Sequence, residues 1–273
     1  MKKKYIIIAA VALPVLLLLV YLIIGFNQKL QVTHYTYADS NLPVEFDGYK
    51  IVVISDLHCT SFGKKNTTLV SQIQKLEPDI VVLTGDIIDT VHSDYSALDN
   101  LLAGICPTFP VYAITGNHEF LSWTVQYLVK EISDKYGVID LDNNTTTLYR
   151  GEASISLTGV AGDKDIQKSA DLPEPTDESP FRILLYHYAN RFDAVSEYGF
   201  NLVLSGHAHG GIIRLPFIGG ILGNDEVLFP KYTAGIYHKN GSTMIVSRGL
   251  GNSNSIPRFY NRPELVCVTL KCK

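Results

Sequence analysis

Cysteine is scarce in this sequence. The chain has four cysteines in 273 residues, too few and too widely spread for a disulfide framework or a zinc finger. Spacing does not choose among the three pairings that Cys59, Cys106, Cys267 and Cys272 allow. A bridge between Cys267 and Cys272 would need a turn, whereas residues 265–270 alternate like a strand. We therefore expect buried free thiols.

An excess of positive charge is also missing. Lys and Arg number 23 against 27 Asp and Glu, which gives a formal net charge of −4. The cations are scattered along the chain, and this argues against nucleic acid as the main partner. No Gly/Ser-rich linker divides the chain, and about 245 residues follow its N-terminal segment, enough for one α/β domain with a sizeable core.

A long apolar run lies at the N-terminus. Three lysines precede an uncharged stretch from Tyr5 to Phe26, long enough for a bilayer core, which needs about 20 helical residues. A cleaved signal peptide has a shorter apolar region and ends in a small-residue site, which is not found here, and Pro14 is a tolerable kink. The sequence predicts a Lys-rich tip and transmembrane anchor in residues 1–27, followed by a catalytic domain in residues 28–273.

The lysines also predict an orientation for this anchor. Three lie directly before the apolar run, and Lys29 is the only cation close after it. The positive-inside rule then keeps the N-terminus cytoplasmic. We expect a single-pass protein of the cell membrane with an extracytoplasmic catalytic domain.

Hydrophobic periodicity predicts an α/β domain. Apolar residues recur near helical spacing in 68–76, 95–102 and 123–136, between short apolar runs typical of buried strands. This order favours βαβ units with right-handed crossovers. Residues 154–160 and 226–246 alternate more regularly, so we expect a second sheet that is more antiparallel.

Polar residues follow the strand-like runs at five places along the chain. These blocks are Asp56-Leu57-His58, Gly85-Asp86-Ile87-Ile88-Asp89, Gly116-Asn117-His118-Glu119, His187, and Gly206-His207-Ala208-His209-Gly210-Gly211. Each block alone is more typical of a turn or of a structural histidine. The first three are separated by about 30 residues, the length of one strand-helix-strand unit, which places strand ends side by side at the edge where ligands bind in α/β sheets.

The residue types in these blocks are those that bind divalent metals. Asp56 and His58 could share one ion if the strand continues that far. Asp86 is a candidate bridge between two ions, because a carboxylate offers two oxygens and a negative charge. The further candidate ligands are Asn117, His187, His207 and His209. This mixture suits Mn, Fe, Zn or Co, whereas four imidazoles argue against calcium.

The motifs DLH, GDIID, GNHE, H and GHAHGG, in this order from Asp56 to Gly211, resemble those of the calcineurin-like metallophosphoesterases. The N-terminal run and the segments 247–251 and 262–264 resemble a membrane-associated bacterial branch of that family, which includes phosphodiesterases and UDP-diacylglucosamine hydrolase-like proteins. The resemblance implies a four-layer αββα sandwich of two mixed sheets flanked by helices, the metallo-dependent phosphatase fold.

The resemblance also implies a cofactor of two divalent metal ions. One would be held by Asp56, His58, Asp86 and His209, and the other by Asp86, Asn117, His187 and His207. His118 would lie beside the metals without binding them, oriented by Asp89, and would donate a proton to the leaving oxygen.

These expectations lead to a metal-dependent phosphohydrolase that cleaves a phosphodiester or pyrophosphate bond. The apolar segment 212–222 after GHAHGG could line an acyl groove or pack in the core as a hairpin, and Arg214 could bind a substrate phosphate or lie on the surface. The expected partner is a phosphoester substrate of a lipid or envelope molecule. Two alternatives remain: an anchored phosphatase for soluble nucleotides or phosphoproteins, and a non-catalytic metal-binding scaffold.

Overall fold

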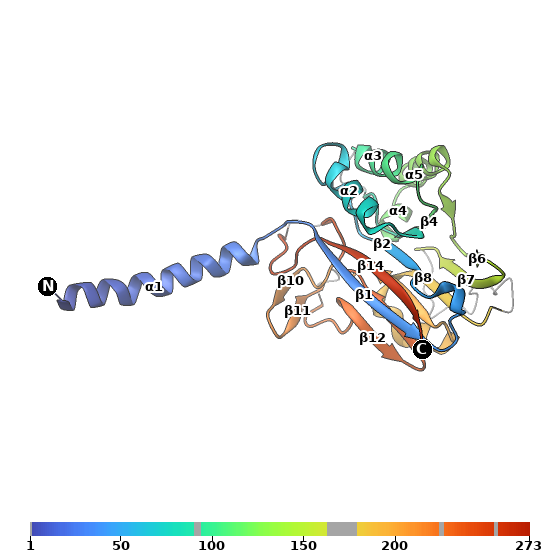
Figure 1. The fold of residues 1–273 in the computed structure, drawn as a ribbon. Coiled ribbons are helices and arrows are strands. Elements are labelled where there is room, and N and C mark those ends of the chain that lie inside the picture. Colours follow the sequence, from blue (N-terminus) through green and yellow to red (C-terminus); the bar gives the residue numbers. More distant parts are fainter. Residues whose placement is uncertain (1, 90–93, 163–178, 224–226, 254–255) are drawn as a thin grey trace.

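The structure is a computed structural model that describes residues 2–89, 94–162, 179–223, 227–253 and 256–273 (Figure 1). Most of these residues form a domain built on two six-stranded mixed sheets. A single helix at the N-terminus, α1 (Lys2–Gly25), projects away from this domain.

The first sheet carries the early strands of the chain. Its order is β1 (Gln31–Asp39), β14 (Glu264–Cys272), β2 (Lys50–Ile54), β3 (Ile80–Thr84), β4 (Val111–Ile114) and β5 (Ile139–Asp140). Only the pair β14 and β2 is antiparallel. The strands β2, β3 and β4 are apolar and largely buried, as expected for strands covered on both faces.

Helices cover the outer face of this sheet. They are α2 (Thr67–Leu76), α3 (Ser96–Ile105) and α5 (Trp123–Tyr136). The apolar residues that the sequence spaces at helical intervals, such as Leu69, Ile73 and Leu101, pack against the sheet in one buried cluster. α5 ends at Gly137, whose φ of 70° is the left-handed conformation that a glycine adopts without steric cost. The predicted positions of these helices agree with the structure.

The second sheet has the order β12 (Gly235–Lys239), β13 (Ser242–Val246), β9 (Leu202–Gly206), β8 (Arg182–Tyr188), β7 (Ala153–Val160) and β6 (Asn144–Arg150). Its two edge pairs are antiparallel and its central pairs are parallel. The antiparallel character expected for this half is therefore confined to the edges. The parallel strands β8 and β9 end at the same side of the domain as β2, β3 and β4, so residues that follow these strands can meet there.

The two sheets pack face to face. Ile51 and Val82 of the first sheet share a buried cluster with Ile183 and Leu204 of the second. The far face of the second sheet packs on the short helix α6 (Phe192–Val195). The mixed α/β sheets agree with the predicted fold class. The other short elements are η1 (Val44–Phe46), η2 (Lys64–Asn66), α4 (Asn117–Phe120), η3 (Ala189–Arg191) and η4 (Ser196–Tyr198).

A separate two-stranded hairpin follows GHAHGG. Its strands are β10 (Ile213–Leu215) and β11 (Gly219–Leu222). The side chains at its tip, Phe217 and Ile218, are exposed. The segment 212–222 is thus a hairpin, as one of the two interpretations held, but its tip lies on the surface and not in the core.

The prediction of a transmembrane anchor is wrong. Among the described residues, no helix has the combination of length and apolarity that crossing a bilayer requires. The prediction of a single-pass membrane protein with an extracytoplasmic domain rests on that anchor and is also wrong.

The cysteines carry no disulfide. Cys59, Cys106, Cys267 and Cys272 are all free, with Cys267 buried and the others partly buried. Burial raises the pKa of the Cys59 thiol and of the Cys106 thiol to about 11, so neither is a thiolate at neutral pH. The expectation of free thiols agrees with the structure.

Candidate metal centre

The candidate ligands meet where the parallel strands of both sheets end. β2, β3 and β4 are neighbours in the first sheet, and β8 and β9 are neighbours in the second. The ends of β2 and β3 are tied together, because the Asp56 amide donates to the Gly85 carbonyl (3.0 Å) and the His58 amide to the Asp86 carbonyl (3.1 Å). Ligands from distant parts of the chain are therefore fixed by backbone hydrogen bonds.

The ligands stand on sharp turns and not on continued strands. β2 ends at Ile54, so the alternating spacing considered for Asp56 and His58 does not apply. The candidate ligands with left-handed backbone, at φ between 44° and 66°, are Asp56, His58, Asp86, His207 and His209. A left-handed residue other than glycine costs about 1–2 kcal/mol, and such strain gathers at functional sites. The turns direct these side chains inward.

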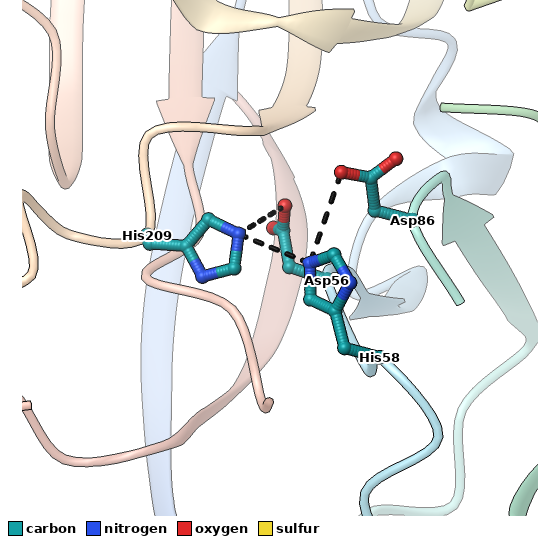
Figure 2. A group of neighbouring side chains, drawn as sticks. All are labelled: Asp56, His58, Asp86 and His209. Atoms are coloured by element: carbon teal, nitrogen blue, oxygen red, sulfur yellow. Dashed lines mark hydrogen bonds and ion pairs between the residues drawn. The ribbon is translucent and has the colours of Figure 1, made fainter. Parts of the chain in front are cut away.

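The first group of side chains surrounds a common space (Figure 2). It comprises Asp56, His58, Asp86 and His209, whose nearest ligand atoms all lie within 4.8 Å of one another. His58 Nε2 is 3.1 Å from His209 Nε2 and 3.8 Å from Asp86 Oδ2, and His209 Nε2 is 3.5 Å from Asp56 Oδ1. All four residues are buried. They have the same members as the first ligand set that the resemblance implied.

The second group shares Asp86 with the first. It comprises Asp86, His187 and His207, and Asn117 adds an amide oxygen 3.0 Å from His207 Nδ1. Asp86 Oδ1 accepts a hydrogen bond from the His118 amide (2.9 Å), while Oδ2 lies 3.2 Å from His187 Nε2. The carboxylate that the sequence singled out as a bridge is the residue common to both groups.

Unpartnered buried atoms show that a cation fits here. Asp86 Oδ2 and His187 Nε2 are buried without a hydrogen-bond partner, which is costly unless a ligand completes them. His187 Nδ1 lies 2.8 Å from the Thr84 carbonyl and donates to it, which turns Nε2 toward Asp86. Fixing one ring nitrogen through a carbonyl is how proteins orient a metal-binding histidine.

The charges also suit a cation. Burial acts to raise the pKa of Asp86, but the imidazoles of His187 and His58 outweigh it and hold this pKa well below its usual value. Burial lowers the pKa of His58 to about 3, and burial, with His58 and Arg258, lowers that of His209. Burial acts to lower the pKa of His187, but the Asp86 carboxylate outweighs it and raises this pKa to about 10. Without a metal, the site therefore pairs the Asp86 carboxylate with a protonated His187 beside the neutral imidazoles of His58 and His209, and a divalent ion would take the place of the His187 proton, because metal binding releases protons from its ligands.

His118 lies at the edge of the first group. Its ring is 4.8 Å from that of His58, centroid to centroid, and its Nδ1 is buried without a hydrogen-bond partner. The Asp89 carboxylate approaches His58, with Oδ2 3.7 Å from Nδ1. The role of Asp89 in orienting His118 stays a prediction, and this distance places Asp89 beside a candidate ligand.

Comparison with known proteins decides the family. Residues 49–211 match the family described as calcineurin-like phosphoesterase. The chain belongs to this family. It is similar to an uncharacterized metallophosphoesterase, YkuE, of Bacillus subtilis (32% identical, covering 89% of this chain and 86% of that one), and to the phosphodiesterase YaeI of Escherichia coli (26% identical, covering 81% and 82%).

Among solved structures, the chain is similar to a putative 5′-nucleotidase from Staphylococcus aureus. The two are 15% identical with a TM-score of 0.49, and the match covers 81% of this chain and 54% of that one. The family and the Asp/His cluster together make this chain a metal-dependent phosphoesterase whose site suits two divalent ions. Mn, Fe, Zn and Co all fit the ligand types.

Arg214 of this phosphoesterase lies in β10, after the turn that carries His207 and His209. Its Nη1 donates to the Gly210 carbonyl (2.5 Å) and to Thr233 Oγ1 (3.3 Å). Burial lowers the pKa of Arg214. These contacts brace the turn, and the role of Arg214 in binding substrate stays a prediction.

Glu119 is a functional residue that the sequence analysis did not single out. Its buried carboxylate accepts hydrogen bonds from the amides of Asp86 (2.9 Å), Ile87 (2.8 Å), Ile88 (3.1 Å) and Gly116 (2.7 Å). It thereby joins the turn that carries Asp86 to the turn that carries Asn117 and His118. Burial, and then the Asp86 charge, raise the pKa of Glu119 to about 7.

Replacing Glu119 by Gln should weaken metal binding without removing a ligand. The amide keeps the shape, but its NH₂ group would face two backbone donors, and leaving such buried groups unpaired costs about 1–3 kcal/mol. We expect metal affinity to fall about 10- to 100-fold, as for other residues that orient ligands. Calorimetric metal titration measures this. Glu131→Gln on the exposed face of α5 is the control, and equal metal affinity in both variants would refute the positioning role.

The C-terminal segment also supports the first group. The Gly251 amide donates to the Asp56 carbonyl (2.6 Å), and Asn261 Nδ2 donates to the His209 carbonyl (2.6 Å). The buried guanidinium of Arg258 donates to the Arg248 carbonyl (2.7 Å) and lies 3.3 Å from His209 Nδ1. Two ligands more than a hundred residues apart in the sequence are thus held by one segment.

Proposed function

We propose that this phosphoesterase hydrolyses a phosphodiester or pyrophosphate bond of a lipid or cell-envelope molecule, with water as the nucleophile. The observation that supports the reaction most directly is the shared Asp86 carboxylate, whose Oδ2 faces His187 Nε2 without a hydrogen-bond partner. When bound, two divalent ions would supply Lewis-acid stabilisation of the phosphoryl charge and an activated water.

Different residues of the chain have different roles in this reaction. Asp56, His58, Asp86 and His209 would hold one ion, and Asp86, Asn117, His187 and His207 the other. His118 lies outside both sets and carries a buried ring nitrogen without a partner. We expect it to give a proton to the leaving oxygen, which a poor leaving group needs.

A hollow next to the second group offers a route for the substrate. It has a volume of about 240 Å³, and its lining includes His207, Asp193, Val227 and Lys231. A substrate in this hollow would therefore contact His207. The Lys231 ammonium lies at the wall of the hollow, 3.0 Å from the Asp193 carboxylate, so the two charges offset each other there.

Exposed apolar side chains beside this hollow support a substrate with an apolar part. Val227 lines the hollow, and Val227, Leu228 and Phe229 are 52%, 65% and 64% exposed. Their segment runs along β11, because the Phe229 amide donates to the Ile221 carbonyl (2.8 Å). Contiguous exposed apolar residues are characteristic of interaction sites.

A substrate comparison tests the lipid assignment. The Leu228→Ser, Phe229→Ser double variant should raise the KM for a long-chain phosphodiester at least tenfold, since fully burying one such side chain contributes about 1.5–3 kcal/mol and 1.36 kcal/mol is tenfold. It should leave kcat/KM for a chromogenic diester without acyl chains unchanged. Val44→Ser, at an exposed apolar residue of η1, is the control.

The alternative is a phosphatase for soluble nucleotides or phosphoproteins. In that case kcat/KM would not depend on acyl chains, and the double variant would behave like the wild type on every substrate. That result would reject the lipid assignment and leave the metal-dependent reaction intact.

A further inference from the structure

A large cavity lies apart from the metal centre, between the end of α1 and the C-terminal segment. Its volume is about 1020 Å³, at the upper end of the about 300–1,000 Å³ typical of small-molecule sites. Three parts of the chain line it. They are residues 26 and 28–32 after α1, the loop 60–63 with the first half of α2, and residues 250–252, 257, 258, 262 and 263 of the C-terminal segment.

The charges of its lining have one sign. Among the described residues that line the cavity, Lys29, Arg258 and Arg262 are cations and none is an acid. This differs from the chain as a whole, where acids outnumber Lys and Arg. Arg258 is 3% exposed, so its charge is screened little by solvent. The cavity therefore favours an anion.

The remaining lining favours an apolar group as well. Phe26, Phe62, Leu250, Pro257 and Pro263 contribute apolar surface. Amides and hydroxyls complete the wall at Gln28, Gln31, Thr60, Ser61, Gln72 and Asn252. A small inorganic anion would leave most of such a cavity unfilled, whereas a neutral apolar ligand would leave the cations without a partner.

We propose that this cavity binds an amphiphilic organic phosphate, with the phosphate toward Lys29 and Arg262 and the apolar chain against Phe26 and Phe62. The site is separate from the hydrolytic centre, because none of the candidate metal ligands lines it. Arg258 forms the wall between them, since it lines the cavity and lies 3.3 Å from His209 Nδ1.

Lys29 is the residue to change. Its side chain is exposed. Among the described residues Lys29 forms hydrogen bonds only through its backbone, with the amide donating to Asn27 Oδ1 and the carbonyl accepting from Arg262. Charge reversal at Lys29 therefore removes attraction for the ligand without removing a contact that holds the fold. Arg258 and Arg262 bind backbone carbonyls and are left intact.

Calorimetry on the metal-free full chain tests the proposal with soluble dihexanoyl phosphatidic acid as the probe. Chelation removes the metal centre as a competing site, and no turnover is needed, so the result is independent of the proposed function. We expect saturable binding of one probe per chain, about tenfold weaker in Lys29→Glu and less affected in Lys29→Gln. Lys130→Glu, on the exposed face of α5, is the matched reversal and should bind like the wild type.

Two reference ligands separate the sources of affinity. Dihexanoylglycerol lacks the phosphate and inorganic phosphate lacks the chains, so both should bind at least tenfold more weakly than the probe. Equal binding of either ligand would overturn the proposal, as would a Lys29→Glu variant with unchanged affinity. An Asp86→Asn variant that keeps full probe binding would show that the cavity, and not the hydrolytic site, holds the ligand.

Discussion

Replacing Asp86 by Asn should abolish turnover and the binding of both metal ions. Asp86 belongs to both ligand groups, and its unpartnered Oδ2 faces the second of them. The amide is neutral and has a single oxygen acceptor, so it does not offset the repulsion between two cations. We expect kcat/KM for a chromogenic phosphodiester to fall on the order of 10³-fold or more, because the metals supply several kcal/mol of charge stabilisation and 1.36 kcal/mol is tenfold.

Asp134→Asn is the matched control, because Asp134 lies on the exposed face of α5 and pairs with Lys130. It should keep wild-type turnover and metal content. If Asp86→Asn retained turnover within a few fold while circular dichroism showed a folded protein, the shared carboxylate would not be the bridge.

Replacing His118 by Ala should reduce turnover selectively on poor leaving groups. His118 lies beside the first ligand group without belonging to it, so metal content should stay at the wild-type level. Loss of a general acid costs about 10²–10⁴-fold when the leaving oxygen needs a proton, and far less when the leaving group is an activated phenolate. Kinetics on an alkyl phosphodiester and on a nitrophenyl phosphodiester measure the two cases.

His34→Ala, at an exposed residue of β1, serves as the control for this variant. An equal loss on both diesters would assign His118 to electrostatic stabilisation of the transition state. A loss of metal from His118→Ala would instead make it a ligand and contradict its separation from the two groups.

The strand ends of this fold can be predicted from the sequence, because their signal is local. Short apolar runs mark β2, β3, β4, β8 and β9, and a polar residue follows or ends each one. Spacings of about 30 residues then place these ends together. The residues that gather at the metal centre were named on that basis. The α/β class and the helices between the first strands follow from the same periodicities.

The supporting residues could not be predicted, because their partners are distant in the sequence. Glu119 binds amides on the turn after β3, and Arg258 lies against a loop and a histidine from other parts of the chain. A glutamate directly after Asn117 and His118 was the sequence signal for Glu119. The left-handed turns were also missed, because aspartate and histidine do not indicate a positive φ as glycine does.

The measurement that tests the account most directly is metal content and turnover on the same preparations of wild-type protein and Asp86→Asn. Wild-type protein dialysed against Mn²⁺ or Zn²⁺ should hold two ions per chain by mass spectrometry of the metals and should hydrolyse a chromogenic phosphodiester. Chelation should remove that activity and metal addition should restore it, while the variant should hold no ion firmly. Turnover that survives complete chelation, or a folded wild-type protein that binds no divalent ion, would contradict the dimetal centre.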